Sequence, residues 1–184
     1  LAAAIEASVE SGLVIIAAAG NSNIDACRTS PAGSASAISV GAINDNKDKI
    51  AGFSNWGHCV DIFSSGVNVQ SVSNNPYDFG RSKQMSGTSM ASPVVAGIAA
   101  QLLGNGTSVL DIRGEINRLA ISGSIPRASL LLRPGSPNKI ASTEVRQQDI
   151  DQKTIPVLQN STLMNKYKKV QILHQALELP LKTH

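Results

Sequence analysis

Short apolar runs without regular polar alternation recur in the first 66 residues, and they limit what this chain can fold into. "LVIIAAA" lies at 13–19, "AISVGAI" at 37–43, and "CVDIFSSG" at 59–66 runs into a glycine turn. Runs rich in β-branched residues are typical of strands buried on both faces, which occur mainly in parallel sheets. Residues 1–11 have helical spacing and end at Gly12, so this helix and the first strand form half of a βαβ unit. The sequence therefore predicts an α/β fold with a mostly parallel sheet.

Two helices are predicted after these strands. "PVVAGIAAQLL", at 93–103, is apolar on every side, which predicts a helix enclosed in the core. Residues 108–120 are amphipathic, with one apolar stripe formed by Val109, Ile112, Ile116 and Leu119. From about residue 142 the composition shifts toward Gln, Asn, Lys and Thr, and glycine disappears. We therefore divide the chain into a domain at 1–141 and an extension at 142–184 with weak helical patterning. The extension could pack on the domain, bind a partner or reflect a mispredicted exon.

The composition argues against two classes of partner. The net charge is only +3, the basic residues are scattered, and 3% of the residues are aromatic, which leaves no stacking surface for nucleic acid. The longest apolar run, at 12–20, is far shorter than the roughly 20 residues of a membrane-spanning helix. We expect neither nucleic acid nor a membrane as a partner.

A serine at the start of an apolar helix is the strongest candidate for chemistry. In "QMSGTSMASPVVAGIAAQLL", at 84–103, Ser89 directly precedes the apolar run. Taken by itself, Ser89 could simply cap the helix. It could also be a nucleophile, because the N–H groups at a helix N-terminus favour an oxyanion. Gly87 would allow a tight turn and close approach of a substrate, and Pro93 is expected in the first helical turn.

The stretch "GTSMASPVVAG" resembles the nucleophile motif of the subtilisin-like serine proteases, or subtilases. Its matching positions are Gly87, Thr88, Ser89, Met90, Ala91, Pro93, Ala96 and Gly97. "AAAGNSN" at 17–23 resembles the strand end that carries the oxyanion-hole asparagine of that family. "SPAGSASAISVGA" and "FSNWGHCVDIF" resemble the segments that follow, and "PGSPNK" resembles the family's closing motif. The resemblance covers about residues 1–141 and is closest to the proteinase K branch, with its aqualysin-like members.

This resemblance implies a three-layer subtilisin-like α/β fold and a serine endopeptidase acting on proteins and peptides. Ser89 would be the nucleophile, and Gly87, Thr88 and Pro93 support the motif. Asn21 would donate its amide to the oxyanion beside the Ser89 backbone N–H. Small residues would line the pocket for the residue before the cleaved bond and leave room for large apolar groups, which suggests broad specificity: Ala18, Ala19 and Gly20.

The resemblance also bears on the two cysteines and on calcium. From composition, Cys27 and Cys59 could be a disulfide or two buried thiols. They occupy the positions of a disulfide in the aqualysin-like members, which implies a bridge and a secreted protein. Asp61 and the carbonyls of Ala35 and Ala37 correspond to a structural calcium site of the proteinase K branch. The alternative is an aspartate that accepts from nearby backbone. The chemistry itself requires no cofactor.

Part of the expected catalytic machinery has no counterpart in these residues. A subtilase also uses an aspartate and a histidine, in the chain order Asp, His, Ser. Neither type occurs before Asn21, and His58 lies in a context where the family tolerates many residues. We expect the C-terminal half of a catalytic domain, inactive by itself, with exposed strand edges and helix faces that an absent N-terminal half would cover. That half would supply Asp and His. The alternative is a catalytically dead subtilase-like binding or regulatory protein, or a degenerate gene product.

Overall fold

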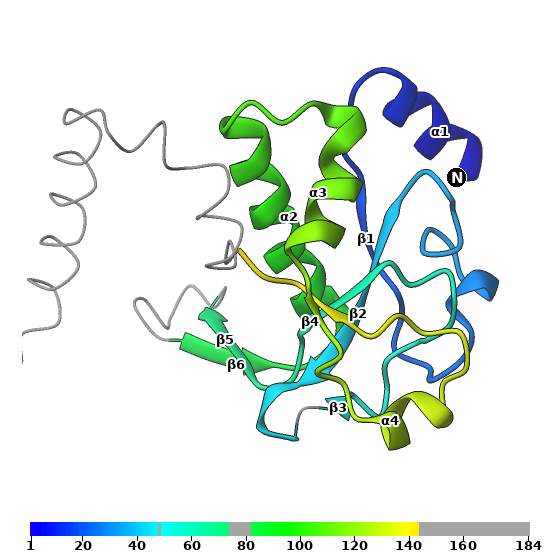
Figure 1. Ribbon diagram of the computed structural model, residues 1–184, viewed down its shortest axis with the longest axis vertical. Helices are drawn as coiled ribbons and strands as arrows, with labels where there is room; N and C mark the ends of the chain where they lie inside the picture. The colour runs from blue at the N-terminus through cyan, green and yellow to red at the C-terminus, as the bar shows by residue number, and fades with distance from the viewer. Residues whose placement is uncertain (48, 74–81, 144–184) are drawn as a thin grey trace, which may run out of the picture. The chain divides into compact units, whose positions relative to one another are not determined.

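The computed structural model describes residues 1–47, 49–73 and 82–143 (Figure 1). Except for Ser142 and Thr143, the predicted extension lies outside the described residues. The helices are α1 (Ala2–Glu10), α2 (Thr88–Gly104), α3 (Ile112–Leu119) and α4 (Arg127–Leu131). Three 3-10 helices lie at Ala26–Arg28, Asp45–Lys47 and Val109–Asp111. The strands are β1 (Ile16–Ala18), β2 (Ile38–Asn44), β3 (Lys49–Ile50), β4 (Ile62–Ser65), β5 (Val69–Val72), β6 (Ser82–Met85), β7 (Ile121–Ser122) and β8 (Lys139–Ile140).

The main sheet is mostly parallel, which confirms the predicted fold class. Its order is β1-β2-β4-β8-β7, and β3 pairs with β2. Strands β1, β2, β4 and β8 run parallel, with Ile16 opposite Ile38 and Val40 opposite Ile62. Only the short strands β3 and β7 join it antiparallel. The three apolar runs of the sequence thus supply three neighbouring strands.

Alternate side chains of β2 pack into two hydrophobic cores, one on each face of the sheet. On one face, apolar residues of β2 and β4 pack against α2 and α3, with Ile38, Val40, Ala42, Ile62, Val95, Ile98, Ile112 and Ile116 all buried. On the other face, Ile43 and Phe63 pack with residues of loops and the region of α4, among them Ala19, Ala26, Val60 and Ile125. The period of two along a strand explains this division. Figure 1 shows α2 and α3 side by side.

Burial of β1 on both faces was predicted and is wrong. Ile16 and Ala18 are only half-buried, whereas six of the seven residues of β2 are buried. The physical reason is position, because within the described residues β1 is the edge strand of the sheet. Continuous apolarity does not distinguish a central strand from an edge strand that lacks a neighbour.

The prediction that α2 is enclosed on every side is also wrong for the described residues. Ala91, Val95, Ile98 and Ala99 face the sheet and are buried, but Val94 on the opposite side is 42% exposed. Pro93, Ala96 and Gly97 are exposed as well. Nothing in the described part of the chain covers this outer face, in agreement with the expectation of exposed helix faces.

Several elements were not predicted. Strands β5 and β6 form a separate antiparallel ribbon, with Val69 opposite Met85, and most of their residues are exposed. Their polar sequences show no alternation that would mark a strand.

Helix α3 was predicted, and it buries Ile112, Ile116 and Leu119 as expected, whereas Val109 lies in the preceding 3-10 turn.

Candidate active site

Helix α2 places Ser89 at an exposed position near its N-terminus. The helix begins at Thr88, and the residue in the capping position is Gly87, so Ser89 is the second helical residue rather than the cap. Its side chain is exposed and makes no hydrogen bond with another residue in the described part of the chain. Gly87 N–H donates to Gly66 O at 2.8 Å, which ties the start of the helix to the end of β4. Among the described residues, none occupies the Ser89 hydroxyl, so this part of the chain leaves it accessible to a ligand.

Pro93 lies deeper in the helix than the sequence predicts. It is the sixth helical residue rather than a first-turn residue, because the helix begins at Thr88. Proline has no N–H to donate, so the carbonyl of Ser89, four residues earlier, lacks its usual partner within the helix. The first-turn prediction for Pro93 is wrong for this reason.

A buried threonine joins the helix start to the loop that follows β1. Thr88 N–H donates to Asn21 Oδ1 at 2.9 Å, and Thr88 Oγ1 donates to the same oxygen at 3.0 Å. Thr88 Oγ1 in turn accepts from Gly20 N–H at 3.1 Å. These three bonds, which we call the Thr88 latch, connect residues 67 and 68 positions apart in the sequence.

The Thr88 latch fixes which end of the Asn21 amide is available to a ligand. A backbone N–H can only donate, so the atom that faces Thr88 N must be the amide oxygen. The amide nitrogen then points elsewhere. A Cβ built on Gly87 would lie 3.4 Å from Asn21 Nδ2, 3.6 Å from Met90 Sδ and 3.7 Å from Ser89 N. The nitrogens of two N–H donors, Asn21 and Ser89, thus lie near one point beside Gly87, which the Met90 sulfur also approaches.

A second asparagine, Asn55, holds the loop from the other side. Its Oδ1 accepts from Ser22 N–H at 3.0 Å and from Ile24 N–H at 3.1 Å, and its Nδ2 donates to Ala19 O at 2.8 Å. The side chain is fully buried. We call these three bonds the Asn55 clamp. Sequence reasoning missed it, although Asn55 lies in the quoted "FSNW" stretch, because no local pattern reveals a bond to a loop 31 to 36 residues away.

The three residues expected to line a substrate pocket differ in exposure. Ala18 and Gly20 are half-buried, whereas the Ala19 side chain is completely buried in the core. Gly20 has a φ of +106°, and a Cβ there would lie 2.4 Å from Asn55 Nδ2. Both the backbone conformation and the Asn55 clamp therefore require glycine at this position.

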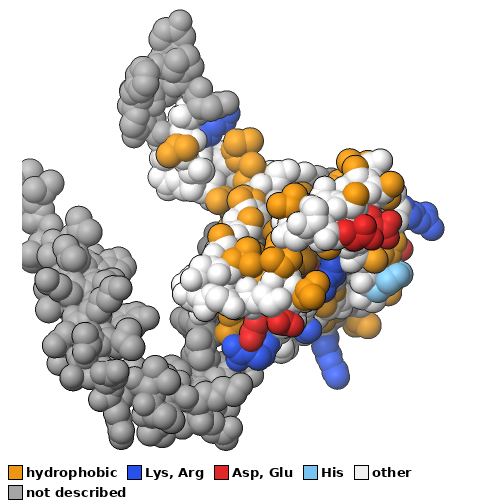
Figure 2. Space-filling model, turned by 90° about the horizontal axis from the view of Figure 1, so that it is seen from above, with side chains coloured by type: hydrophobic (Ala, Val, Ile, Leu, Met, Phe, Trp, Pro, Cys, Tyr) orange, Lys and Arg blue, Asp and Glu red, His pale blue; other side chains and the backbone are white. Residues whose placement is uncertain are grey.

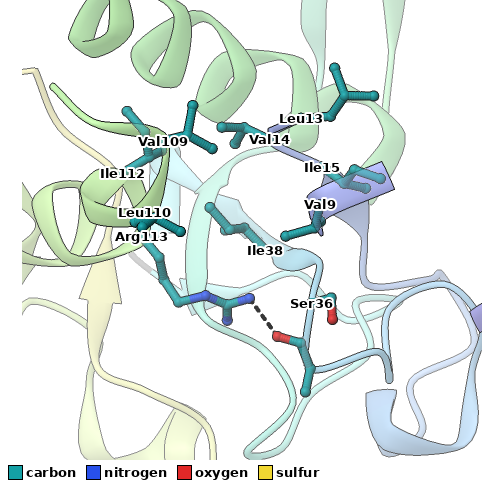
Figure 3. A pocket seen from close by; sticks show the side chains of 11 residues that line it. Val9, Leu13, Val14, Ile15, Ser36, Ile38, Val109, Leu110, Ile112 and Arg113 are labelled. Carbon is teal, nitrogen blue, oxygen red and sulfur yellow. Dashed lines mark hydrogen bonds between the residues drawn. The ribbon is translucent and has the colours of Figure 1, made fainter. Parts of the chain in front are cut away.

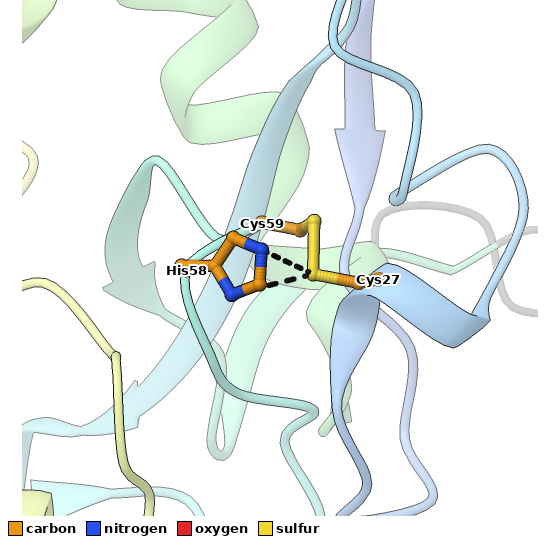
Figure 4. A group of neighbouring side chains, drawn as sticks. All are labelled: Cys27, His58 and Cys59. Atoms are coloured by element: carbon orange, nitrogen blue, oxygen red, sulfur yellow. Dashed lines mark hydrogen bonds between the residues drawn. A yellow bond between two sulfur atoms is a disulfide. The ribbon is translucent and has the colours of Figure 1, made fainter.

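Cys27 and Cys59 form a disulfide, with their Cα atoms 5.2 Å apart (Figure 4). The His58 ring lies against this bridge, with Nε2 3.4 Å from Cys27 Sγ. Two thiols and an imidazole are a common metal-ligand set, but the sulfurs bonded to each other offer no thiolate. His58 is the one histidine in the described part of the chain, and it adjoins the disulfide. His174 and His184 lie outside the described residues.

The three expected calcium ligands are all engaged by an arginine. Arg113 of α3 donates to Ala35 O at 2.8 Å and to Ala37 O at 2.9 Å, and it forms an ion pair with Asp61 Oδ1. The other carboxylate oxygen of Asp61 accepts from Ser39 N–H at 2.7 Å. Asp61 therefore also accepts a hydrogen bond from nearby backbone, as the alternative interpretation of this residue expected. This donor set does not fit a calcium ion as the chain stands, because a guanidinium already uses the oxygens that would bind the metal.

Charged side chains form a few small groups on the face seen in Figure 2, where hydrophobic side chains and uncharged atoms cover most of the surface. No helix in the described residues is long and apolar enough to cross a membrane.

Comparisons with known proteins agree with the geometry. A profile described as the subtilase family matches residues 1–143. The subtilase-type proteinase RRT12 of Saccharomyces cerevisiae is 43% identical over 157 residues, which is 84% of this chain and 32% of that protein. A cuticle-degrading serine protease of Arthrobotrys oligospora is 44% identical over 141 residues, which is 75% of this chain and 33% of that protein.

A solved structure shows the same fold. A cold adapted subtilisin-like serine proteinase superposes with a TM-score of 0.69 and 38% identity, over 78% of this chain and 50% of the other. The chain spans about a third of the length of the two curated relatives above.

Proposed function

Because this chain belongs to the subtilase family, we propose that it is the part of a serine endopeptidase that carries the nucleophile, Ser89. The Ser89 hydroxyl oxygen attacks the carbonyl carbon of a peptide bond while a base takes its proton. The carbon–nitrogen bond breaks, the amine leaves with that proton, and an acyl group remains on Ser89. Water then releases the acyl group and restores the hydroxyl. The substrates are proteins and peptides, and this chemistry requires no cofactor.

One observation carries the proposal: the nitrogens of two N–H donors lie near one point beside Gly87, next to an exposed serine. Asn21 Nδ2 and Ser89 N are 3.4 Å and 3.7 Å from the position of a Cβ built on Gly87, and Met90 Sδ is 3.6 Å from it. Negative charge develops on the carbonyl oxygen during acyl transfer, and donors held in place stabilise it without having to reorganise. The Thr88 latch holds Asn21, and the partial positive charge of the N-terminus of α2 acts in the same direction.

The pocket for the residue before the cleaved bond is proposed at the end of β1. Ala18 and Gly20 present little side-chain bulk, so large apolar or aromatic groups would fit and specificity would be broad. Ala19 contributes through its backbone, since its side chain is buried.

The general base and the aspartate that orients it are proposed to come from residues outside these 184. His58 adjoins the disulfide, where its ring contacts Cys27 Sγ rather than a catalytic serine. Without a base, the Ser89 hydroxyl is a poor nucleophile. The 184-residue chain by itself is then expected to have no measurable peptidase activity.

An oxidising compartment is proposed for the protein, which would be secreted. The Cys27–Cys59 disulfide supports this, because such bridges persist mainly in extracellular and secretory environments. The name of the cuticle-degrading relative is compatible with it.

The test starts by sequencing the transcript upstream of the codon for Leu1. An in-frame segment with Asp and His in subtilase-like contexts is expected. The longer protein should then react with a fluorophosphonate probe, and the Ser89→Ala variant should not. In the longer protein, Asn21→Ala should lower the rate of peptide hydrolysis by about 10²–10³, a figure taken from subtilisin itself rather than derived from this structure.

Three results would contradict the proposal. If no such segment exists, or if the longer protein does not label at Ser89, the chain is a subtilase-like binding or regulatory protein or a degenerate gene product. If the 184-residue chain hydrolyses an unstructured peptide, and Ser89→Ala abolishes this, the base does not come from elsewhere.

A further inference from the structure

Three oxygen acceptors converge where strands β2 and β4 begin. The carbonyls of Ala35 and Ala37 come from the segment that leads into β2, and Asp61 directly precedes β4. One oxygen of Asp61, Oδ2, accepts from Ser39 N–H. The other, Oδ1, faces Arg113, which also binds both carbonyls. A carboxylate and two carbonyl dipoles directed at one place create a negative potential that favours a cation.

Arg113 supplies that cation from within the chain. One terminal nitrogen of its guanidinium donates to both carbonyls, at 2.8 and 2.9 Å, and the other pairs with Asp61. The planar fork of a guanidinium suits several acceptors at once, and its charge is permanent. Figure 3 shows the Arg113 side chain beside an apolar hollow, with a dashed line from its guanidinium to an oxygen of the lining.

The position of the guanidinium is set by the fold. Arg113 lies on α3 between the core residues Ile112 and Ile116, each 1% exposed, so the helix cannot shift without losing its packing. The Asp61 and Arg113 side chains are 17% and 38% exposed. The ion pair is thus partly shielded from solvent, and it links α3 to the starts of two central strands.

A divalent ion and this guanidinium exclude each other. Calcium takes six to eight oxygen ligands at roughly 2.3–2.6 Å, so it would need the same three oxygens. It would also lie next to a fixed positive charge.

We propose that Arg113 takes the place of a structural divalent cation in this chain. Stability at this site is then independent of calcium, and removal of the guanidinium exposes a latent site for a hard cation such as calcium. This proposal does not depend on whether Ser89 is catalytic.

The test is thermal unfolding of the full 184-residue chain, followed by circular dichroism, in 5 mM calcium chloride and in 5 mM EDTA. The melting temperature of the unmodified chain should agree within about 1 °C between the two conditions. Arg113→Ala should melt roughly 5 °C lower in EDTA, because it leaves the Asp61 carboxylate without its partner. Calcium should restore at least half of this loss. If the variant is unfolded in EDTA, calcium should restore its helical signal.

Two control variants distinguish calcium binding at the Arg113 site from a general effect of removing positive charge. Arg118→Ala removes another arginine of α3, paired with Glu115 on the surface, and should leave the calcium response at zero. Arg113→Ala combined with Asp61→Asn should lose the calcium rescue, because the carboxylate is gone. Calorimetric titration with calcium should detect binding to Arg113→Ala and not to the unmodified chain.

Three results would overturn the proposal. One is a calcium-dependent rise in the melting temperature of the unmodified chain that Asp61→Asn removes. Another is a calcium response of Arg113→Ala no larger than that of Arg118→Ala. The last is an Arg113→Ala variant that stays unfolded both with and without calcium.

Discussion

Replacing Asn55 by alanine should be among the most destabilising single changes near the candidate site. The side chain is fully buried and makes three hydrogen bonds, two as acceptor and one as donor. Ser22 and Ile24 are exposed, so water can replace the lost acceptor for their N–H groups. Ala19 O is buried, and its other contact, Thr29 Oγ1 at 3.2 Å, has a single proton and lies closer to Ala26 O at 2.8 Å, so this hydroxyl does not replace the lost donor. At about 1 kcal/mol for each bond, the loss is about 3 kcal/mol.

The measurement is urea unfolding of the full chain, with the free energy taken from the midpoint and slope. A loss of about 3 kcal/mol corresponds to roughly 6–12 °C in melting temperature for a domain of this size. Asn105→Ala is the matched control, because Asn105 is exposed at the end of α2 and should change stability by less than about 0.5 kcal/mol. If Asn55→Ala falls within 0.5 kcal/mol of the unmodified chain, the Asn55 clamp does not hold this loop.

Two further predictions use the same unfolding measurement. Gly20→Ala should cost about 2 kcal/mol or more, because it combines a φ of +106° with a contact at 2.4 Å to Asn55 Nδ2. Gly12→Ala, with a φ of +95° and open space around its Cβ, should cost only about 1 kcal/mol, and equal losses would show that the Asn55 contact contributes nothing. Replacing both Cys27 and Cys59 by serine should lower stability by about 3–4 kcal/mol, given a separation of 32 residues. Reducing agent should destabilise the unmodified chain and leave this variant unchanged; a variant as stable as the oxidised chain would contradict the estimate.

The parts of the fold that could be predicted are those with a local signal. Strands β2 and β4 are buried along nearly their whole length, as their continuous apolar runs predict, and helix α3 buries three residues of its apolar stripe. The polar strands β5 and β6 have no such local signal. The apolar sequence of α2 shows what the helix can bury and not whether a partner is present, so by itself it predicted an enclosed helix. The expectation of exposed helix faces came from the family resemblance, which implies an absent N-terminal half.

The candidate site divides in the same way. Ser89 and Asn21 are identified by short motifs, but the groups that hold them are joined only by the fold. Thr88 bonds to a residue 67 positions away, and Arg113 to carbonyls 76 and 78 positions away. No window along the sequence contains both partners of such a bond. The sequence pattern behind the calcium expectation could not show that Arg113 engages the same three oxygens, since this arginine lies on a distant helix.

Because of the Thr88 latch, an intact motif is not by itself evidence that the chain has been kept for catalysis. Thr88 bridges Gly20 and Asn21, and Gly20 must lack a Cβ because of Asn55, so folding itself restrains these residues. A descendant that had stopped cleaving peptides would still keep them in order to fold. Ser89 is different, because its exposed hydroxyl bonds to no other residue in the described part of the chain. Among related sequences, the identity of residue 89 is therefore the informative record of whether hydrolysis is still under selection.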